Sequence, residues 1–281
     1  MKRFLPLLEV LLYVIMFLVI QMAVTFLVTG VQLCITAGTE NDDLTTQIKA
    51  LLSGTFMPDA TGLIIISVIS SVLTLLLFLL LRWAPVSPTY LRSRPWAVFA
   101  WTVVLTLGTI IPSTWLSEQI PYEMPKDLEA MLIHMMHNRW GYLAIGILAP
   151  LAEEVVFRGA VLRVLLKVVD ERWHWIPIIL SAIIFGAVHG NVQQFVHAML
   201  IGLILGWMYY RTRSILPGVL FHWVNNSAAY VITNLMPGAE NAHLVDFFGG
   251  DQQAVWMSLI FSCCLILPAL FQLYLHMRKA K

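Results

Sequence analysis

The chain has 281 residues, of which 59% are hydrophobic and only 12% are charged. An ordinary soluble domain has about 25% charged residues, and one water-soluble core of this size cannot hide so much apolar surface. The composition therefore excludes a cytosolic enzyme and predicts one membrane-embedded helical domain. The net charge of +1, from 17 Lys and Arg against 16 Asp and Glu, lacks the basic surface that a nucleic acid partner requires.

The cysteines indicate neither disulfides nor a metal site. They are Cys34, Cys263 and Cys264; the last two are adjacent in sequence, and none has CxxC spacing. Adjacent cysteines are poorly placed for an ordinary disulfide, and CxxC pairs are the usual sign of a cysteine metal site. We therefore predict no disulfide framework and no cysteine-bound metal.

Eight apolar runs are long enough to cross a bilayer, whose hydrocarbon core takes about 20 helical residues. The first run exceeds the apolar part of a signal peptide and is expected to be retained; the third and fifth are short. In chain order the runs are Leu5–Leu33, Gly62–Leu81, Trp96–Ile111, Trp140–Val164, Trp175–Val188, Gln194–Tyr210, Ile215–Leu235 and Val255–Leu275. The sequence thus predicts an all-α, polytopic membrane protein with about eight transmembrane helices in one bundle.

The distribution of Lys and Arg predicts the orientation of the bundle, because cytoplasmic segments collect these residues. With the N-terminus inside, the outer loops keep only Lys49, Lys126 and Arg139. The compact loops favour a bacterial plasma membrane, with both termini in the cytoplasm. The inner segments then hold Lys2, Arg3, Arg82, Arg92, Arg94, Arg163, Lys167, Arg172, Arg211, Arg213, Arg278, Lys279 and Lys281.

We divide the bundle into three parts. Residues 1–139 hold the first three helices and an outer segment, Pro125–His137, whose apolar residues have the spacing of an interfacial helix. Residues 140–235 hold helices four to seven, and residues 236–281 hold the last outer loop, the eighth helix and a basic tail. Two glycine pairs have the GxxxG spacing that allows close helix contact: Gly186 with Gly190, and Gly202 with Gly206.

Ionisable residues inside spanning helices are rare and costly, so each needs a partner or a function. In the fourth span, Glu154 and Arg158 stand four residues apart on one helix face, where an ion pair compensates both charges. Glu153 lies about 100° away around the helix and has no partner within its own segment. Glu153 is therefore the candidate for general-base work on water.

Two other spans offer polar groups at a similar depth. His189 ends the fifth span, while His222 and Asn226 share one face of the seventh. At about 1.5 Å per residue, Glu153, His189 and His222 lie roughly 15, 18 and 13 Å from the inner ends of their helices. Three separate helices can therefore bring these groups to one buried site.

The ordered motifs EExxxR, FxxxH and HxxxN resemble those of the CPBP family of intramembrane proteases. The family includes type II CAAX prenyl endopeptidases and bacterial relatives linked to bacteriocin processing and self-immunity. The resemblance covers about residues 140–235, and each motif lies in its own predicted span. The motif residues are Glu153, Glu154, Arg158, Phe185, His189, His222 and Asn226.

The resemblance implies roles for these residues. Glu153 would activate water with help from His189, His222 and Asn226 would stabilise the oxyanion, and Glu154 with Arg158 would give structural support. No cofactor is expected, because a metal-free mechanism gives Asn226 a natural role as a hydrogen-bond donor. The alternative is zinc held by Glu153, His189 and His222 with an open position.

Our main hypothesis is an intramembrane endopeptidase acting on a membrane-associated peptide or protein, which could be lipidated. Its partners would be membrane lipid and this substrate. One alternative is a catalytically silent scaffold or bacteriocin self-immunity protein. A proton-coupled transporter would also use buried carboxylates and histidines, but the sequence lacks the paired interrupted helices of an inverted repeat.

Overall fold

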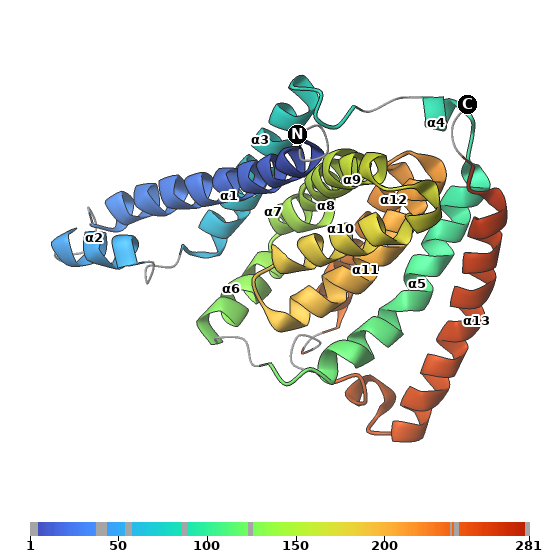
Figure 1. The fold of residues 1–281 in the computed structure, drawn as a ribbon. Helices are drawn as coiled ribbons and strands as arrows, with labels where there is room; N and C mark the ends of the chain where they lie inside the picture. The colour runs from blue at the N-terminus through green and yellow to red at the C-terminus, as the bar shows by residue number, and fades with distance from the viewer. Residues whose placement is uncertain are drawn as a thin grey trace.

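The computed structural model describes residues 5–37, 44–53, 58–85, 89–122, 126–236, 238 and 242–278, and within these ranges the chain forms helices and no strand (Figure 1). The predicted all-α fold is confirmed. The basic residues at the two ends, Lys2, Arg3, Lys279 and Lys281, lie outside the described ranges. The predicted orientation of the termini therefore stays a prediction.

Every predicted span corresponds to a helical segment. Five helices of the described chain are long and apolar enough to cross a membrane. They are α1 (Leu5–Ala37), α3 (Ala60–Leu80), α5 (Trp96–Glu118), α11 (Val192–Thr212) and α13 (Gln252–His276). The other segments are residues 139–168, α10 (Trp175–Ala187), which is short, and α12 (Leu216–Leu235). The protein is a multi-pass membrane protein, and eight crossings stay a prediction.

Several shorter helices join these segments. The expected amphipathic segment is present as α6 (Lys126–His137), while its predicted first residue, Pro125, lies outside the described ranges. Two short helices were not predicted: α2 (Leu44–Ser53) and α4 (Thr89–Arg92). Single 3₁₀ turns lie at Glu171–Trp173 and Asp246–Phe248.

The fourth segment is one continuous helix that changes its hydrogen-bond register. It comprises α7 (Arg139–Gly141), the π-helical η1 (Tyr142–Leu148), α8 (Ala149–Glu154), the π-helical η2 (Val155–Leu162) and α9 (Arg163–Val168). π-Helical stretches are rare and frequently occur at functional sites. Both flank α8, the short helix that carries Glu153 and Glu154.

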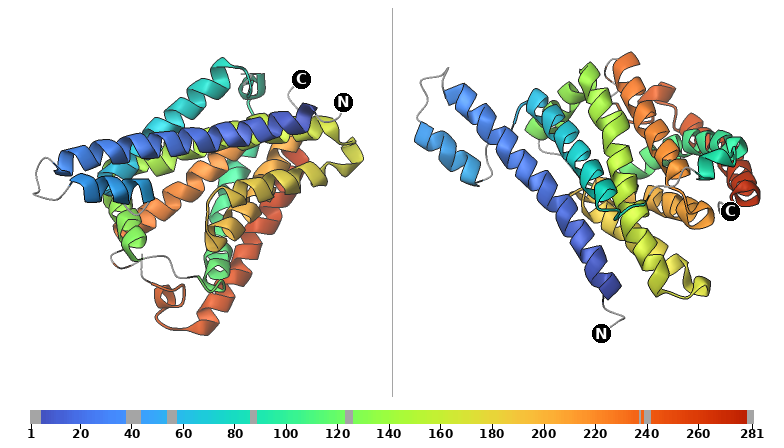
Figure 2. Two further views of the ribbon diagram at one scale, coloured as in Figure 1. Left: turned by 60° about the vertical axis from the view of Figure 1, so that its left-hand side comes forward. Right: turned by 90° about the horizontal axis from the view of Figure 1, so that it is seen from above.

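This fourth segment lies in the middle of the molecule, beside α10, α11 and α12 (Figures 1 and 2). Helices α1 and α3 pack along one side of it, and α5 packs with α13 on the other side, against α12. The most deeply buried stretch is η2, all of whose residues are buried. The motif residues therefore lie at the centre of the bundle, whereas α1 and α13 expose many large apolar side chains, as lipid contact requires.

Helices α10 and α11 form a tight hairpin whose glycines have two different uses. A Cβ atom added at Gly202 would meet Ala182 at 3.1 Å, and one added at Gly206 would meet the Ile178 side chain at 2.9 Å. These two glycines, with Gly186, allow the close helix contact that the spacing predicts. The prediction for Gly190 is wrong: this residue has φ +77° in the turn after α10, where a Cβ would contact nothing, so it serves the turn.

We expect Gly202→Leu to separate α10 from α11, because overpacking a filled contact costs about 1–3 kcal/mol. The thermal unfolding midpoint of the purified protein in detergent should fall. Ala187→Leu makes a comparable small-to-large change at an exposed position of α10 and should leave the midpoint unchanged. Equal midpoints for the two variants would contradict the close contact.

Candidate active site

A buried ion pair forms the base of the site. Arg158 Nη1 donates to Glu154 Oε1 at 2.7 Å, and the two side chains are 1% and 0% exposed. Arg158 Nη2 also donates to Gly202 O at 3.4 Å, and the guanidinium lies 4.3 Å from the ring centroid of Phe185. The ion pair expected from the i, i+4 spacing is therefore present, and it also contacts α10 and α11.

His222 lies between the two adjacent glutamates. Its Nδ1 atom is 3.5 Å from Glu154 Oε1, and its Nε2 atom is 3.7 Å from Glu153 Oε2. The sequence predicted that Glu153 has no partner in its own segment, and the partner indeed comes from α12. Glu153 keeps 20% of its side chain exposed, whereas the His222 side chain is 9% exposed.

Phe185 contacts both histidines of the motifs. Its ring, 1% exposed, meets His189 edge to face at a centroid distance of 5.0 Å and meets His222 at 5.9 Å. His189 Nδ1 lies 2.8 Å from Phe185 O. Because a carbonyl oxygen can only accept, this contact places the proton on Nδ1 and leaves Nε2 of a neutral ring as an acceptor.

Asn226 is tied to the fourth segment by a break in that helix. Its Nδ2 atom donates to Ile145 O at 3.0 Å. In the π-helical register each N–H donates to the carbonyl five residues earlier, as Ala149 N does to Ala144 O. The donor for Ile145 O would therefore be the N–H of residue 150. Residue 150 is a proline without an N–H, so the Asn226 amide satisfies this carbonyl. One of its two N–H groups remains for another acceptor.

Glu153 faces a cavity of about 300 Å³ between α1, α3, α6 and the fourth segment. Five polar side chains share this space: Gln21, Ser67, Ser70, Ser71 and Glu153. The apolar part of the lining is Phe17, Leu63, Ile66, Leu132, Met135, Ala149 and Ala152. The candidate base therefore has access to a partly polar space next to the buried ion pair.

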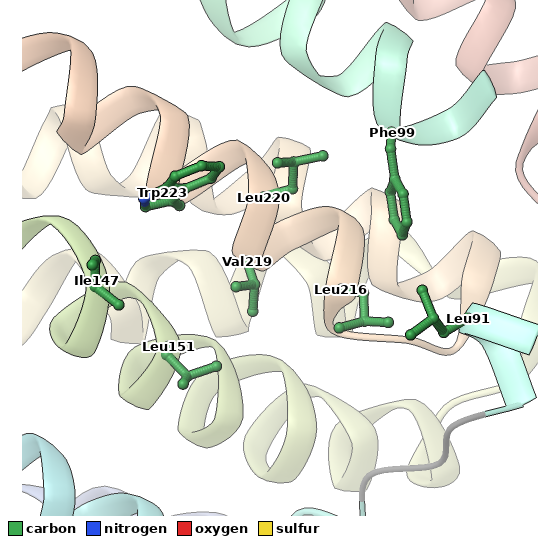
Figure 3. A pocket seen from close by; sticks show the side chains of 8 residues that line it. All are labelled: Leu91, Phe99, Ile147, Leu151, Leu216, Val219, Leu220 and Trp223. Atoms are coloured by element: carbon green, nitrogen blue, oxygen red, sulfur yellow. The ribbon is translucent and has the colours of Figure 1, made fainter. Parts of the chain in front are cut away.

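An apolar groove of about 480 Å³ lies on the other side of the fourth segment, toward α12 (Figure 3). Leu151 borders it three residues before Glu154, and Val219 and Trp223 border it on either side of His222 in sequence. Leu91 of α4 lies at one end of the groove. Burial of the neighbouring Tyr90 raises the pKa of its hydroxyl to about 12, so this residue stays neutral. The remaining lining residues are Phe99, Ile147, Leu216 and Leu220.

The residues proposed as zinc ligands do not form a ready metal site. Within the described ranges, no three His, Cys, Asp or Glu side chains lie close enough together to hold a metal ion. The set of Glu153, His189 and His222 therefore does not fit zinc in this arrangement, and the steps below use only the chain's own groups. Metal analysis of the purified protein tests the zinc alternative.

Sequence reasoning missed several residues that shape the site. Phe185 entered only as part of a motif, although it contacts both histidines and Arg158. Gly218 of α12 lies against the ion pair, because a Cβ there would be 2.6 Å from Glu154 Oε2. The GxxxG search could not find it, since no second glycine stands four residues away.

One known protein family matches the central segment of the chain. Residues 135–228 match the family described as Rce1-like, type II CAAX prenyl endopeptidase Rce1-like. The match covers about a third of the chain and contains all the motif residues, so the resemblance to the CPBP family is confirmed. Comparison with curated proteins gives no match, and neither does comparison with solved structures.

We expect the structural and chemical roles of Asn226 to separate in a two-residue experiment. Asn226→Ala leaves Ile145 O unsatisfied and should lower stability by about 1–3 kcal/mol. In a Pro150→Ala background the N–H of residue 150 can donate to Ile145 O. Asn226→Ala should therefore lower stability by less in this background. Thermal unfolding of the four proteins measures the difference.

The same four proteins test the oxyanion role. If Asn226 also contacts the reacting oxygen, the Pro150→Ala, Asn226→Ala double variant recovers stability without recovering proteolysis. Recovery of both would show that Asn226 acts only on the helix.

Proposed function

We propose that this protein is an intramembrane endopeptidase that hydrolyses a peptide bond of a membrane-associated or lipidated peptide or protein. The observation that carries the proposal is the placement of Glu153, which faces a partly polar cavity while its carboxylate lies 3.7 Å from His222. The match of residues 135–228 to a protease family supports the same reaction class.

Glu153 is the proposed general base. A water oxygen in the cavity attacks the substrate carbonyl carbon, Glu153 takes the water proton, and the proton passes to the leaving nitrogen as the C–N bond breaks. His189 assists by accepting a hydrogen bond from this water, because its Nδ1 proton is committed to Phe185 O.

His222 and Asn226 are the proposed donors to the oxyanion. With His222 protonated, the set of Glu153, Glu154, Arg158 and His222 has zero net charge, and both ring nitrogens are donors. Nδ1 lies toward Glu154 and Nε2 toward Glu153, and the Nε2–H group is the proposed donor to the oxyanion. The free N–H of Asn226 is the second donor, and each such donor is worth about 2.7–4 kcal/mol in a water-excluded site.

The apolar groove supports the choice of substrate. All eight lining residues are apolar or aromatic, and Leu151, Val219 and Trp223 stand within three residues of Glu154 or His222. An apolar side chain or a lipid group of the substrate fits this surface. We place the scissile bond in the inner half of the bilayer, with both termini cytoplasmic, as the distribution of Lys and Arg favours.

Replacing Glu153 by Gln should abolish cleavage, because the amide cannot take the water proton. The expected folding cost is small, since Glu153 has no direct hydrogen bond within the described chain. Mass spectrometry of membrane peptides from cells that express wild-type protein or Glu153→Gln should show new peptide termini only with the wild type.

Glu9→Gln removes a carboxylate from an exposed position of α1 and is the matched control that should cleave like the wild type. Unchanged peptide termini with Glu153→Gln would exclude Glu153 as the base. A biological phenotype that survives this substitution without cleavage would favour the silent scaffold or self-immunity protein.

Filling the groove should reduce cleavage of substrates with large apolar groups. Val219→Trp adds an indole ring to the groove and leaves Glu153 and His222 in place. We expect KM to rise by about tenfold or more for a farnesylated peptide, and by less for the same peptide with a short thioether. Steady-state kinetics of both peptides measures the ratio, and an unchanged ratio would remove the groove from the substrate site.

A further inference from the structure

Helix α3 carries a polar face that the proposed reaction does not use. Ser67, Ser70 and Ser71 lie at positions i, i+3 and i+4, so their side chains share one side of the helix. Ser70 and Ser71 are 1% and 3% exposed. Thr74, one turn further, is fully buried, and its hydroxyl has no hydrogen-bond partner among the described residues.

This face lines the same cavity as Glu153. The cavity of about 300 Å³ also receives Gln21 from α1, so an amide and three hydroxyls share the space with the proposed base. Helices α1 and α3 lie outside residues 135–228, which match the protease family. The polar groups opposite Glu153 therefore come from a part of the chain that the family match does not cover.

Two ordinary explanations account for only part of this arrangement. Ser70 Oγ donates to Ser67 O at 3.3 Å, as serines in membrane helices often do. Small residues also allow α3 to pack closely on the fourth segment. Neither explanation requires Gln21, whose side chain is large, nor an open cavity at the contact. A serine that donates to its own helix still has lone pairs that can accept.

A peptide substrate supplies hydrogen-bond partners for the serine hydroxyls and the Gln21 amide. A bond inside a helix must leave the helix before its carbonyl can be attacked, and each backbone N–H and C=O group freed at this depth needs a hydrogen-bond partner. The hydroxyls and the amide can both donate and accept. The cavity lies at the lower end of the range for ligand pockets, roughly 300–1,000 Å³, so it accepts a short stretch of chain.

We propose that Gln21, Ser67, Ser70 and Ser71 bind the main chain of an extended substrate segment beside Glu153. Ser67 and Ser71 are about 6 Å apart along the helix axis, which matches about two residues of extended chain at about 3.3 Å each. These side chains fix which bond faces Glu153. This inference rests on the proposed peptidase function and adds the part of the protein that sets the cleavage position.

The triple variant Ser67→Ala, Ser70→Ala, Ser71→Ala tests the proposal because it keeps the small size of the residues and removes only the hydroxyls. The probe is the set of new peptide termini in membranes of cells that express each variant at equal level. One lost hydrogen bond lowers binding about fivefold, so we expect cleavage to fall by about a hundredfold. The remaining termini should spread over neighbouring bonds, because the chain can then slide.

Ser262→Ala is the matched control. Ser262 is a buried serine on α13 that donates to its own helix. The Ser262→Ala variant should therefore cleave at the wild-type level and at the wild-type position. Thermal unfolding of the purified triple variant should match the wild type. If the triple variant fails to fold, Gln21→Met takes its place, because Met keeps the length of Gln without its donors and acceptors.

The outcomes separate this inference from the function on which it rests. Wild-type cleavage by the triple variant, or by Gln21→Met in its place, together with an inactive Glu153→Gln variant, overturns the binding role and leaves the peptidase intact. A uniform loss of activity without any spread of cleavage positions also overturns it. If the wild type produces no more termini than Glu153→Gln, both the peptidase function and this inference fail.

Discussion

The arrangement of the site depends on one buried ion pair. Two full charges away from water are tolerated only when they compensate each other closely, and removing one partner of such a pair typically costs about 3–5 kcal/mol. Arg158 meets Glu154, a carbonyl of α11 and the ring of Phe185 on α10, so the pair draws three helices to one point. Gly202 and Gly218 leave the space that its atoms need.

The pair also constrains where the neighbouring motif side chains can lie. Glu154 Oε1 is the atom that faces both Arg158 and His222, so the charge that stabilises the fold also orients an imidazole of the site. Glu153, the preceding residue, turns away from the guanidinium by the angle of one helical step and reaches the cavity. Two adjacent identical side chains thus acquire different environments from helix geometry alone.

The sequence predicted the parts of this arrangement that depend on one helix at a time. Spans, the Glu154–Arg158 pair and the amphipathic α6 follow from periodicity and spacing, which a chain carries locally. The sequence does not predict the contacts of His222 with both glutamates or the contact of Asn226 with Ile145. A residue count along a helix gives the depth of a side chain but not the direction in which it points. The serines of α3 were overlooked since they interrupt an apolar run too weakly to alter its hydropathy.

The fourth segment separates two unlike spaces: a partly polar cavity toward α1 and α3, and an apolar groove toward α5 and α12. Helices α1 and α3, which line the cavity, lie outside the family match, whereas the motif residues lie within the matched segment. The groove is thereby encoded mainly within the matched segment, whereas the wall of the cavity formed by α1 and α3 is encoded in a different stretch of the gene. Substitutions in the first helices can therefore reshape the cavity without changing any motif residue.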